Sequence, residues 1–262
     1  MEIFNLKKEN EIETHGLHIA YGMKASGLSD KSSSSLRSLL YTSTPGLLLA
    51  GDEEILLPPQ SVTVIKSGIE AKLLMTPAEM DAPVVMFRVP DEKPHIPEEQ
   101  AAKLENPYVI NGSEWNTEIK EFLDGDIILY TDASRYVAFL LKKGKAVKSG
   151  WFTTAFKGQP LSVSDAVWTK PRLEEIAHYH NIIREAYVIL DGTANLYVNG
   201  DIVPVPSGSL ALTDLADTHK VDSVEVGSSG TYRHLCTQYP SITNDKGERV
   251  NVDNKEGFTV RG

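Results

Sequence analysis

HYHNIIREAYVILDGTANLYVNGDIVPVPSGSLALTDLADTH, residues 178–219, is the stretch that decides the fold. A strand places alternate side chains on one face, so His178 and His180 project together. Glu185 follows on the next part of the sheet, and His219 returns to the same place if the sheet closes on itself. Three imidazoles and one carboxylate form a ligand set that suits Fe, Mn, Ni, Co, Cu or Zn and suits Mg or Ca poorly. The stretch therefore predicts one divalent transition metal.

The spacing of these residues resembles the cupin superfamily, whose two motifs are G(X)5HXH(X)3,4E(X)6G and G(X)5PXG(X)2H(X)3N. The positions that match the two motifs are His178, His180, Glu185, Gly192, Gly208 and His219. The resemblance implies a small β-barrel, the double-stranded β-helix or jelly roll, with the three histidines and the glutamate as metal ligands. It leaves the reaction open, because the superfamily includes dioxygenases, isomerases, epimerases, lyases, decarboxylases and sugar binders that are not enzymes.

Four motif positions depart from the cupin pattern without removing a ligand. Arg172 stands in place of the opening Gly, Asp214 in place of the Pro, Ala216 in place of the second Gly and Ser223 in place of the Asn. An HxH pair alone is more often two partly exposed polar residues on a strand. Four ligand types in register are much harder to obtain by chance, so we interpret the set as a metal site.

Length, charge and cysteine content limit the classes of protein. The 262 residues are enough for one large or two ordinary domains. The formal charge of −10 argues against a nucleic-acid partner. Cys236 is the only cysteine, which excludes an intrachain disulfide and suits a reducing compartment. No apolar run has the length of a signal peptide or a membrane span, so we expect a cytoplasmic protein with no membrane partner.

The first half of the chain repeats the pattern of the second half weakly. Residues 51–71 align with 200–219, so that Pro58 falls under Pro206 and Ser61 falls under Ser209. Ala71 then stands where His219 stands, and no HxH pair precedes it. Such repeats decide the architecture. We therefore expect a second, degenerate cupin-like barrel that binds no metal.

Short strand candidates separated by turn residues run through both halves. They predict an all-β chain with two jelly-roll barrels in tandem. Residues 98–105 and Thr117–Leu123 have helical composition, with Asn116 as a candidate N-cap, and predict short linker helices. The expected domains are a degenerate barrel at 1–92, a linker at 93–124 and the metal-binding barrel at 125–262.

Three functions follow from this interpretation. The first is an isomerase, epimerase or lyase that acts on a small oxygenated molecule with the metal as a Lewis acid. The second is an Fe(II)-dependent dioxygenase, and the third is a barrel that binds a small molecule or sugar without turnover. The expected partner is a small-molecule substrate, and the sequence leaves a homodimer open.

Two residues are candidates for moving the proton. Tyr187 lies two residues after Glu185 on the same strand face, where a nearby cation would lower the pKa of its phenol. His234 is the second choice. A structural role is about as good an interpretation for Tyr187 and the better one for His234. Cys236 is interpreted as a small buried hydrophobic residue.

Overall fold

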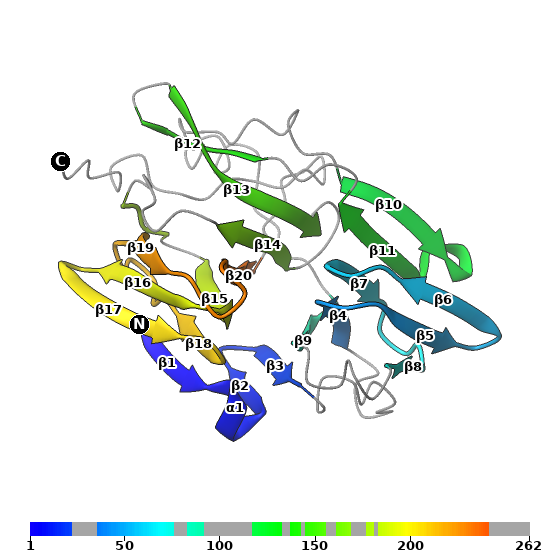
Figure 1. Ribbon diagram of the computed structural model, residues 1–262. Coiled ribbons are helices and arrows are strands. Elements are labelled where there is room, and N and C mark those ends of the chain that lie inside the picture. Colours follow the sequence, from blue (N-terminus) through cyan, green and yellow to red (C-terminus); the bar gives the residue numbers. More distant parts are fainter. Residues whose placement is uncertain are drawn as a thin grey trace, which may run out of the picture.

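The computed structural model describes residues 1–22, 36–75, 83–91, 117–132, 137–142, 145–155, 161–168, 177–180 and 183–240 (Figure 1). Nearly all regular structure within them is antiparallel β-sheet, which confirms the all-β prediction. The α-helix of this part is the single turn α1 (Leu6–Glu9), capped by the side chain of Asn5. No helix among these residues is long and apolar enough to cross a membrane.

The C-terminal unit carries the predicted metal residues and consists of two sheets. The larger sheet has the strand order β1-β18-β15-β20-β14-β13-β12 and the smaller one β17-β16-β19. The strands of the larger sheet are β1 (Glu2–Asn5), β12 (Val137–Lys142), β13 (Lys145–Ala155), β14 (Ser162–Trp168), β15 (Arg184–Asp191), β18 (Ser209–Leu212) and β20 (Tyr232–Tyr239). Those of the smaller sheet are β16 (Thr193–Val198), β17 (Asp201–Pro206) and β19 (His219–Glu225).

The N-terminal unit has the same two-sheet plan. Its larger sheet has the order β10-β11-β7-β4-β9-β3-β2 and its smaller sheet the order β6-β5-β8. The strands of the larger sheet are β2 (Glu11–Thr14), β3 (Leu17–Tyr21), β4 (Leu36–Thr42), β7 (Ser61–Ile65), β9 (Val84–Pro90), β10 (Thr117–Phe122) and β11 (Ile127–Asp132). Those of the smaller sheet are β5 (Gly46–Ala50), β6 (Glu53–Leu57) and β8 (Ala71–Leu74).

Strand pairing shows that the two units are structural repeats. The run β4–β8 pairs as the run β15–β19 does, because in each unit the first and fourth strands of the run join the larger sheet and the other three form the smaller one. Ala71 pairs with Ala50 where His219 pairs with Val198. The weak repeat in the sequence therefore corresponds to a repeat in the fold, with Ala71 at the position of His219.

The hairpin between β16 and β17 illustrates how local sequence fixes the sheet. Asn199 and Gly200 form its turn, with φ of 52° and 109°. Asn and Gly tolerate such positive φ angles, and turns of this kind match the twist of the flanking strands. The turn sets the register in which Val198 pairs with Asp201.

The two units share a buried core between their larger sheets, which lie side by side (Figure 1). Leu39, Val64 and Phe87 from the N-terminal unit belong to the same apolar cluster as Val188 and Leu235 from the C-terminal unit. Each unit also has a separate interior cluster between its own two sheets. Inner strands of the larger sheets, such as β7, β9, β15 and β18, are thus buried on both faces, which explains their nearly continuous apolar runs.

A buried polar contact crosses the same interface. The Tyr41 hydroxyl of β4 donates to Asp165 Oδ2 of β14 at 3.0 Å. Arg233 of β20 holds the same carboxylate with two bonds, of 2.9 Å from Nε and 2.6 Å from a terminal nitrogen. Asp165 is 2% exposed, so its charge depends on these partners.

One of the two predicted linker helices needs correction. Thr117–Leu123 is not a helix, because Thr117–Phe122 forms β10, which pairs with β11 along its whole length. The short run has helix-favouring residues, but sheet pairing overrides that weak preference. The predicted helix at 98–105 lies outside the described residues.

The predicted division at 1–92, 93–124 and 125–262 does not follow the sheets. β1 pairs with β18 of the C-terminal unit, and β11 pairs with β7 of the N-terminal unit. The N-terminal segment and the 117–132 hairpin therefore belong to sheets that the sequence assigned elsewhere. Pairing between distant strands is not visible in local composition.

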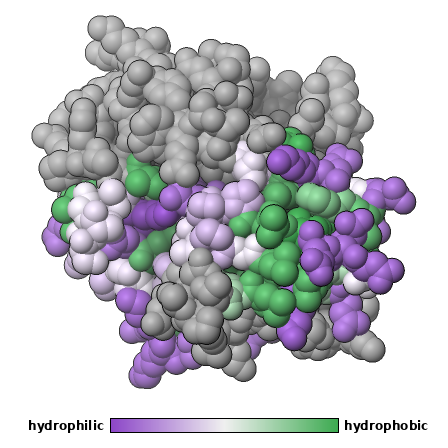
Figure 2. All heavy atoms as spheres, turned by 45° about the vertical axis from the view of Figure 1, so that its right-hand side comes forward, coloured by the Kyte–Doolittle hydropathy of each residue, from purple (hydrophilic) through white to green (hydrophobic). Residues whose placement is uncertain are grey.

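Apolar side chains also reach the surface of the N-terminal unit. Figure 2, with the right-hand side of Figure 1 turned forward, shows a broad apolar patch on that side of the molecule. The large exposed apolar residues of this unit are Leu56, Leu74 and Ile119.

Candidate metal centre

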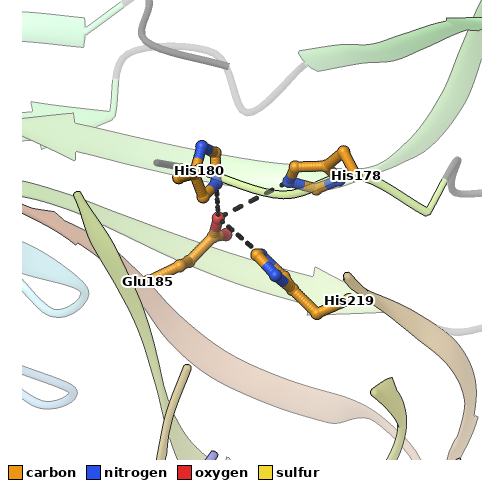
Figure 3. A group of neighbouring side chains, drawn as sticks. All are labelled: His178, His180, Glu185 and His219. Atoms are coloured by element: carbon orange, nitrogen blue, oxygen red, sulfur yellow. Dashed lines mark hydrogen bonds and ion pairs between the residues drawn. The ribbon is translucent and has the colours of Figure 1, made fainter. Parts of the chain in front are cut away.

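The four predicted ligands come together in the C-terminal unit (Figure 3). Glu185 is the second residue of β15, and His219 is the first residue of β19. His178 forms a bridge with His219 through two backbone hydrogen bonds, from His178 N to His219 O at 3.0 Å and from His219 N to His178 O at 2.7 Å. This bridge holds the HxH segment beside β19, with both imidazoles facing Glu185 (Figure 3).

The geometry is that of a compact ligand group. One ligand atom from each residue can be chosen so that all lie within 4.8 Å of one another. Glu185 Oε2 lies 2.9 Å from His180 Nε2, 3.3 Å from His219 Nε2 and 3.7 Å from His178 Nε2. All four residues are buried, with no more than 6% of any of them exposed.

Burial and hydrogen bonds set the charge of the group. Burial alone raises the pKa of Glu185, but its hydrogen bonds with the three histidines outweigh burial and hold that pKa well below the usual range. Burial lowers the pKa of His219, against the opposing effect of Glu185. An ionised carboxylate and a neutral imidazole are the forms that ligate metals.

Neighbouring groups fix the orientation of two ligands. His219 Nδ1 lies 2.7 Å from the carbonyl oxygen of Asp217, an acceptor that would hold a proton on Nδ1 and leave Nε2 free to ligate an ion. The thiol of Cys236 donates to Glu185 Oε1 at 2.8 Å. Gln238 Nε2 donates to Oε2 at 3.4 Å. The thiol bond leaves Oε2 as the carboxylate oxygen that faces the histidines.

The turn before His219 keeps its shape despite the departures from the motif. Ala216 has a φ of 62°, the left-handed conformation that favours Gly. Its N–H donates to the carbonyl oxygen of His180 at 2.8 Å. Asp214 N donates to Asp217 Oδ2 at 2.9 Å, which closes the turn where the motif has Pro. The replaced residues therefore still deliver His219 to the group.

The structure also accounts for two other motif positions, Gly192 and Ser223. Gly192 has a φ of 77°, and a Cβ there would lie 2.2 Å from the carbonyl oxygen of Glu225, so only Gly fits. Ser223, in place of the Asn, accepts a hydrogen bond from Asn195 at 3.1 Å. Arg172 lies outside the described residues.

Tyr187 and His234 lie next to the ligand group on the same wall. The Tyr187 ring is 2% exposed, and its centroid is 6.4 Å from that of His219 and 5.6 Å from that of His234. His234 is 3% exposed, and burial lowers its pKa to about 4. Its ring is thus neutral near pH 7. The interior location fits the sequence expectation for both residues, and their catalytic roles stay predictions.

Sequence reasoning missed two residues that contact Glu185. Cys236 was interpreted as a buried hydrophobic residue, but it is only partly buried and bonds to a ligand. Gln238 was not singled out. Both alternate with His234 on β20, and β20 pairs with β15 so that Gln238 lies opposite Glu185. The alternation was visible in residues 231–238, but the pairing was not.

The four residues fit a divalent transition metal. Three imidazole nitrogens and one carboxylate oxygen point toward one another from the 178–180 segment, β15 and β19 (Figure 3). They are buried, and an ion bound among them would supply positive charge to balance an ionised Glu185.

Comparisons with known proteins bear on the fold. No family model and no curated protein matches the sequence. Among solved structures, oxalate decarboxylase from Bacillus subtilis matches with a TM-score of 0.52 and 12% identity, over 92% of this chain and 76% of that one. Protein Ylba from E. coli matches with a TM-score of 0.50 and 10% identity, over 90% and 89%.

A third similar structure is a cupin 2 conserved barrel domain protein from Leptotrichia buccalis, at a TM-score of 0.46 and 10% identity over 91% of this chain and 96% of that one. At such identities the matches concern the fold. The two repeated jelly-roll units agree with the likenesses to oxalate decarboxylase and Ylba, so the chain has a cupin-type fold with two barrels. Its C-terminal barrel contains a buried group of three histidines and one glutamate that could hold a metal ion.

Proposed function

We propose that the chain is a metal-dependent enzyme that acts on a small oxygenated molecule, of the isomerase, epimerase or lyase type. The observation that carries the proposal is the buried group of His178, His180, Glu185 and His219, whose ligand atoms lie within 4.8 Å of one another. A group of this kind costs stability unless it holds an ion, because it concentrates polar atoms away from water.

The four residues would hold the ion, each through one atom. When bound, the ion would act as a Lewis acid toward a carbonyl or hydroxyl oxygen of the substrate. Cys236 and Gln238 hold Glu185 in place. Asp217 holds the ring of His219. These contacts keep the ligand group preorganised before a substrate arrives.

Tyr187 is the residue that we propose to move the proton. It lies on β15 two residues from Glu185, so strand alternation puts both side chains on the interior face. Its ring contacts the edge of His219. His234, neutral because burial lowers its pKa to about 4, packs against the other side of Tyr187 and provides a buried polar neighbour.

The experiment is isotope exchange in D2O under anaerobic conditions. The protein, loaded with Zn, Mn or Fe, is incubated with a panel of hydroxy aldehydes, hydroxy ketones and sugar acids, and proton NMR follows loss of the C–H signal next to the carbonyl. Manganese is included because Bacillus subtilis oxalate decarboxylase, a structural relative, has Mn(II) centres. The proposal predicts exchange with at least one compound. The exchange should also occur when the loaded metal is zinc, which has no redox chemistry here.

Two variants sharpen the result. Glu185→Gln should abolish exchange, and Tyr187→Phe should keep the metal while lowering exchange by roughly a hundredfold. The assay is then repeated in air, where turnover that needs iron and consumes O2 would instead favour the dioxygenase. Binding of a compound without exchange, elimination or any other conversion would favour the non-catalytic barrel. Either result would overturn the proposal.

A further inference from the structure

The N-terminal barrel contains a buried arginine that the metal site does not use. Arg88 lies on β9, where alternate residues face opposite cores. Val85, Phe87 and Val89 belong to the cluster between the two units, and Val84 and Met86 belong to the interior cluster of the N-terminal unit. By strand alternation, Arg88 faces the same barrel interior as Met86.

Arg88 is 8% exposed, and its Nε is buried without a hydrogen-bond acceptor among the described residues. Two other arginines of the described chain show the usual arrangement. Arg233 is paired with Asp165 and Arg37 with Asp91. A buried N–H without an acceptor is costly, since it has lost water and gained no partner. The Nε–H of Arg88 is therefore an unused donor on a charged group, and an acceptor from outside the described residues could pair with it.

Two further polar residues lie beside Arg88. His18 of β3 and Ser38 of β4 are its direct cross-strand partners, one on each side. Direct partners in a sheet project to the same face. The Nδ1 atom of His18 is buried and lacks a partner among the described residues, and its Nε2 lies 3.0 Å from Glu11 Oε1. A guanidinium, an imidazole and a hydroxyl thus converge at one end of the barrel.

The repeat shows what this end of the barrel corresponds to. Ser38 pairs with Ile65 and Arg88 as Glu185 pairs with Thr213 and Gln238, so Ser38 takes the place of the ligand Glu185 and Arg88 that of Gln238. The end that gathers metal ligands in the C-terminal barrel therefore carries a fixed positive charge in the N-terminal barrel. This end of the C-terminal barrel therefore suits a cation, and the corresponding end of the N-terminal barrel suits an anion.

We propose that the N-terminal barrel binds a small molecule through its carboxylate group, held by Arg88 with Ser38 and His18 beside it. The planar guanidinium matches a carboxylate with two parallel hydrogen bonds. One fixed positive charge balances a monoanion, and the nearby Glu11 disfavours a dianion such as phosphate. The apolar neighbours Met86 and Leu40 suit the body of an organic acid.

Acetate titration of the full-length, metal-loaded protein in chloride buffer tests the proposal. The 1H–15N signal of the Arg88 Nε–H reports directly on the site, and assignment uses Arg88→Lys. The expected result is a saturable shift of this signal, with inorganic phosphate binding more weakly than acetate. Arg88→Met lacks this signal, so the backbone amide signals of its strand partners His18 and Ser38 follow the titration in both proteins. The variant should weaken acetate binding by roughly thirtyfold or more, as expected for loss of one partner from a buried charge pair.

Two control variants separate this site from its alternatives. Arg37→Met removes an arginine from the neighbouring strand whose partner is Asp91, and it should leave the titration unchanged. His178→Ala/His180→Ala should also leave it unchanged, which separates the site from the metal group. No saturable shift in the wild type, equal binding by Arg88→Met, loss in the double histidine variant or a preference for phosphate would each overturn the proposal. The wild-type titration decides even if Arg88→Met does not fold.

Discussion

Replacing His234 with Phe should make the protein more resistant to acid. His234 is 3% exposed and packs against the rings of Tyr187 and Tyr232, with centroid distances of 5.6 Å and 5.3 Å. Its Nδ1 has no hydrogen-bond partner among the described residues. Phe fills a similar volume, packs on the same rings and has no charge to desolvate.

The size of the effect follows from the pKa of His234. Burial lowers that pKa from 6.5 to about 4. Between these two values the unfolded chain binds a proton that the folded protein does not, so stability falls as the pH falls. The loss due to this residue is about 2 kcal/mol between pH 7 and pH 5, and about 3 kcal/mol by pH 4.

The assay is urea denaturation of metal-free wild type and His234→Phe at pH 7 and pH 5, followed by circular dichroism. Other titrating groups contribute equally to both proteins, so the difference between their pH dependences isolates His234. The wild type should lose about 2 kcal/mol more than the variant over this interval. Parallel pH dependences would refute a buried neutral imidazole at this position.

Three further predictions concern residues around the two units. Cys236→Ala should lower metal affinity by roughly tenfold, because Ala cannot donate a hydrogen bond to Glu185 Oε1. Cys236→Ser should keep the affinity near that of the wild type, because its hydroxyl can donate. Equal metal titrations for both variants would contradict this. Asp165→Asn should destabilise the protein by about 3 kcal/mol or more in urea, because it leaves the Arg233 charge buried without its partner, and a change within the error of the assay would be evidence against that role. Ala216→Gly should raise the unfolding free energy by about 0.5 kcal/mol, since Gly adopts the φ of 62° without strain; a lower thermal midpoint would disprove strain there.

The sequence was most informative where function depends on local spacing. The alternation of His178 and His180, and the position of Glu185 at the start of an apolar strand, predicted three members of the group. His219 was predicted from its resemblance to the second motif. The internal repeat, seen in Pro58 and Ser61, predicted the second barrel because repeated turns and strands leave matching patterns.

What could not be predicted depends on pairing between distant strands. The contact of Cys236 with Glu185 exists because β20 pairs with β15, and the position of Arg88 beside Ser38 exists because β9 pairs with β4. Neither pairing leaves a local signal. The same limit explains why Thr117–Leu123 was predicted as a helix, since the place of β10 at the edge of the sheet depends on β11.

The metal content of the purified protein tests the central claim most directly. Protein prepared without chelators, with a His178→Ala/His180→Ala variant and a His15→Ala control, is analysed for Fe, Mn, Co, Ni, Cu and Zn by mass spectrometry. His15 is partly exposed and lies outside the ligand group. We predict about one divalent metal per chain in the wild type and in His15→Ala, and almost none in the double variant. Equal metal in the wild type and in the double variant would contradict the assignment of the site.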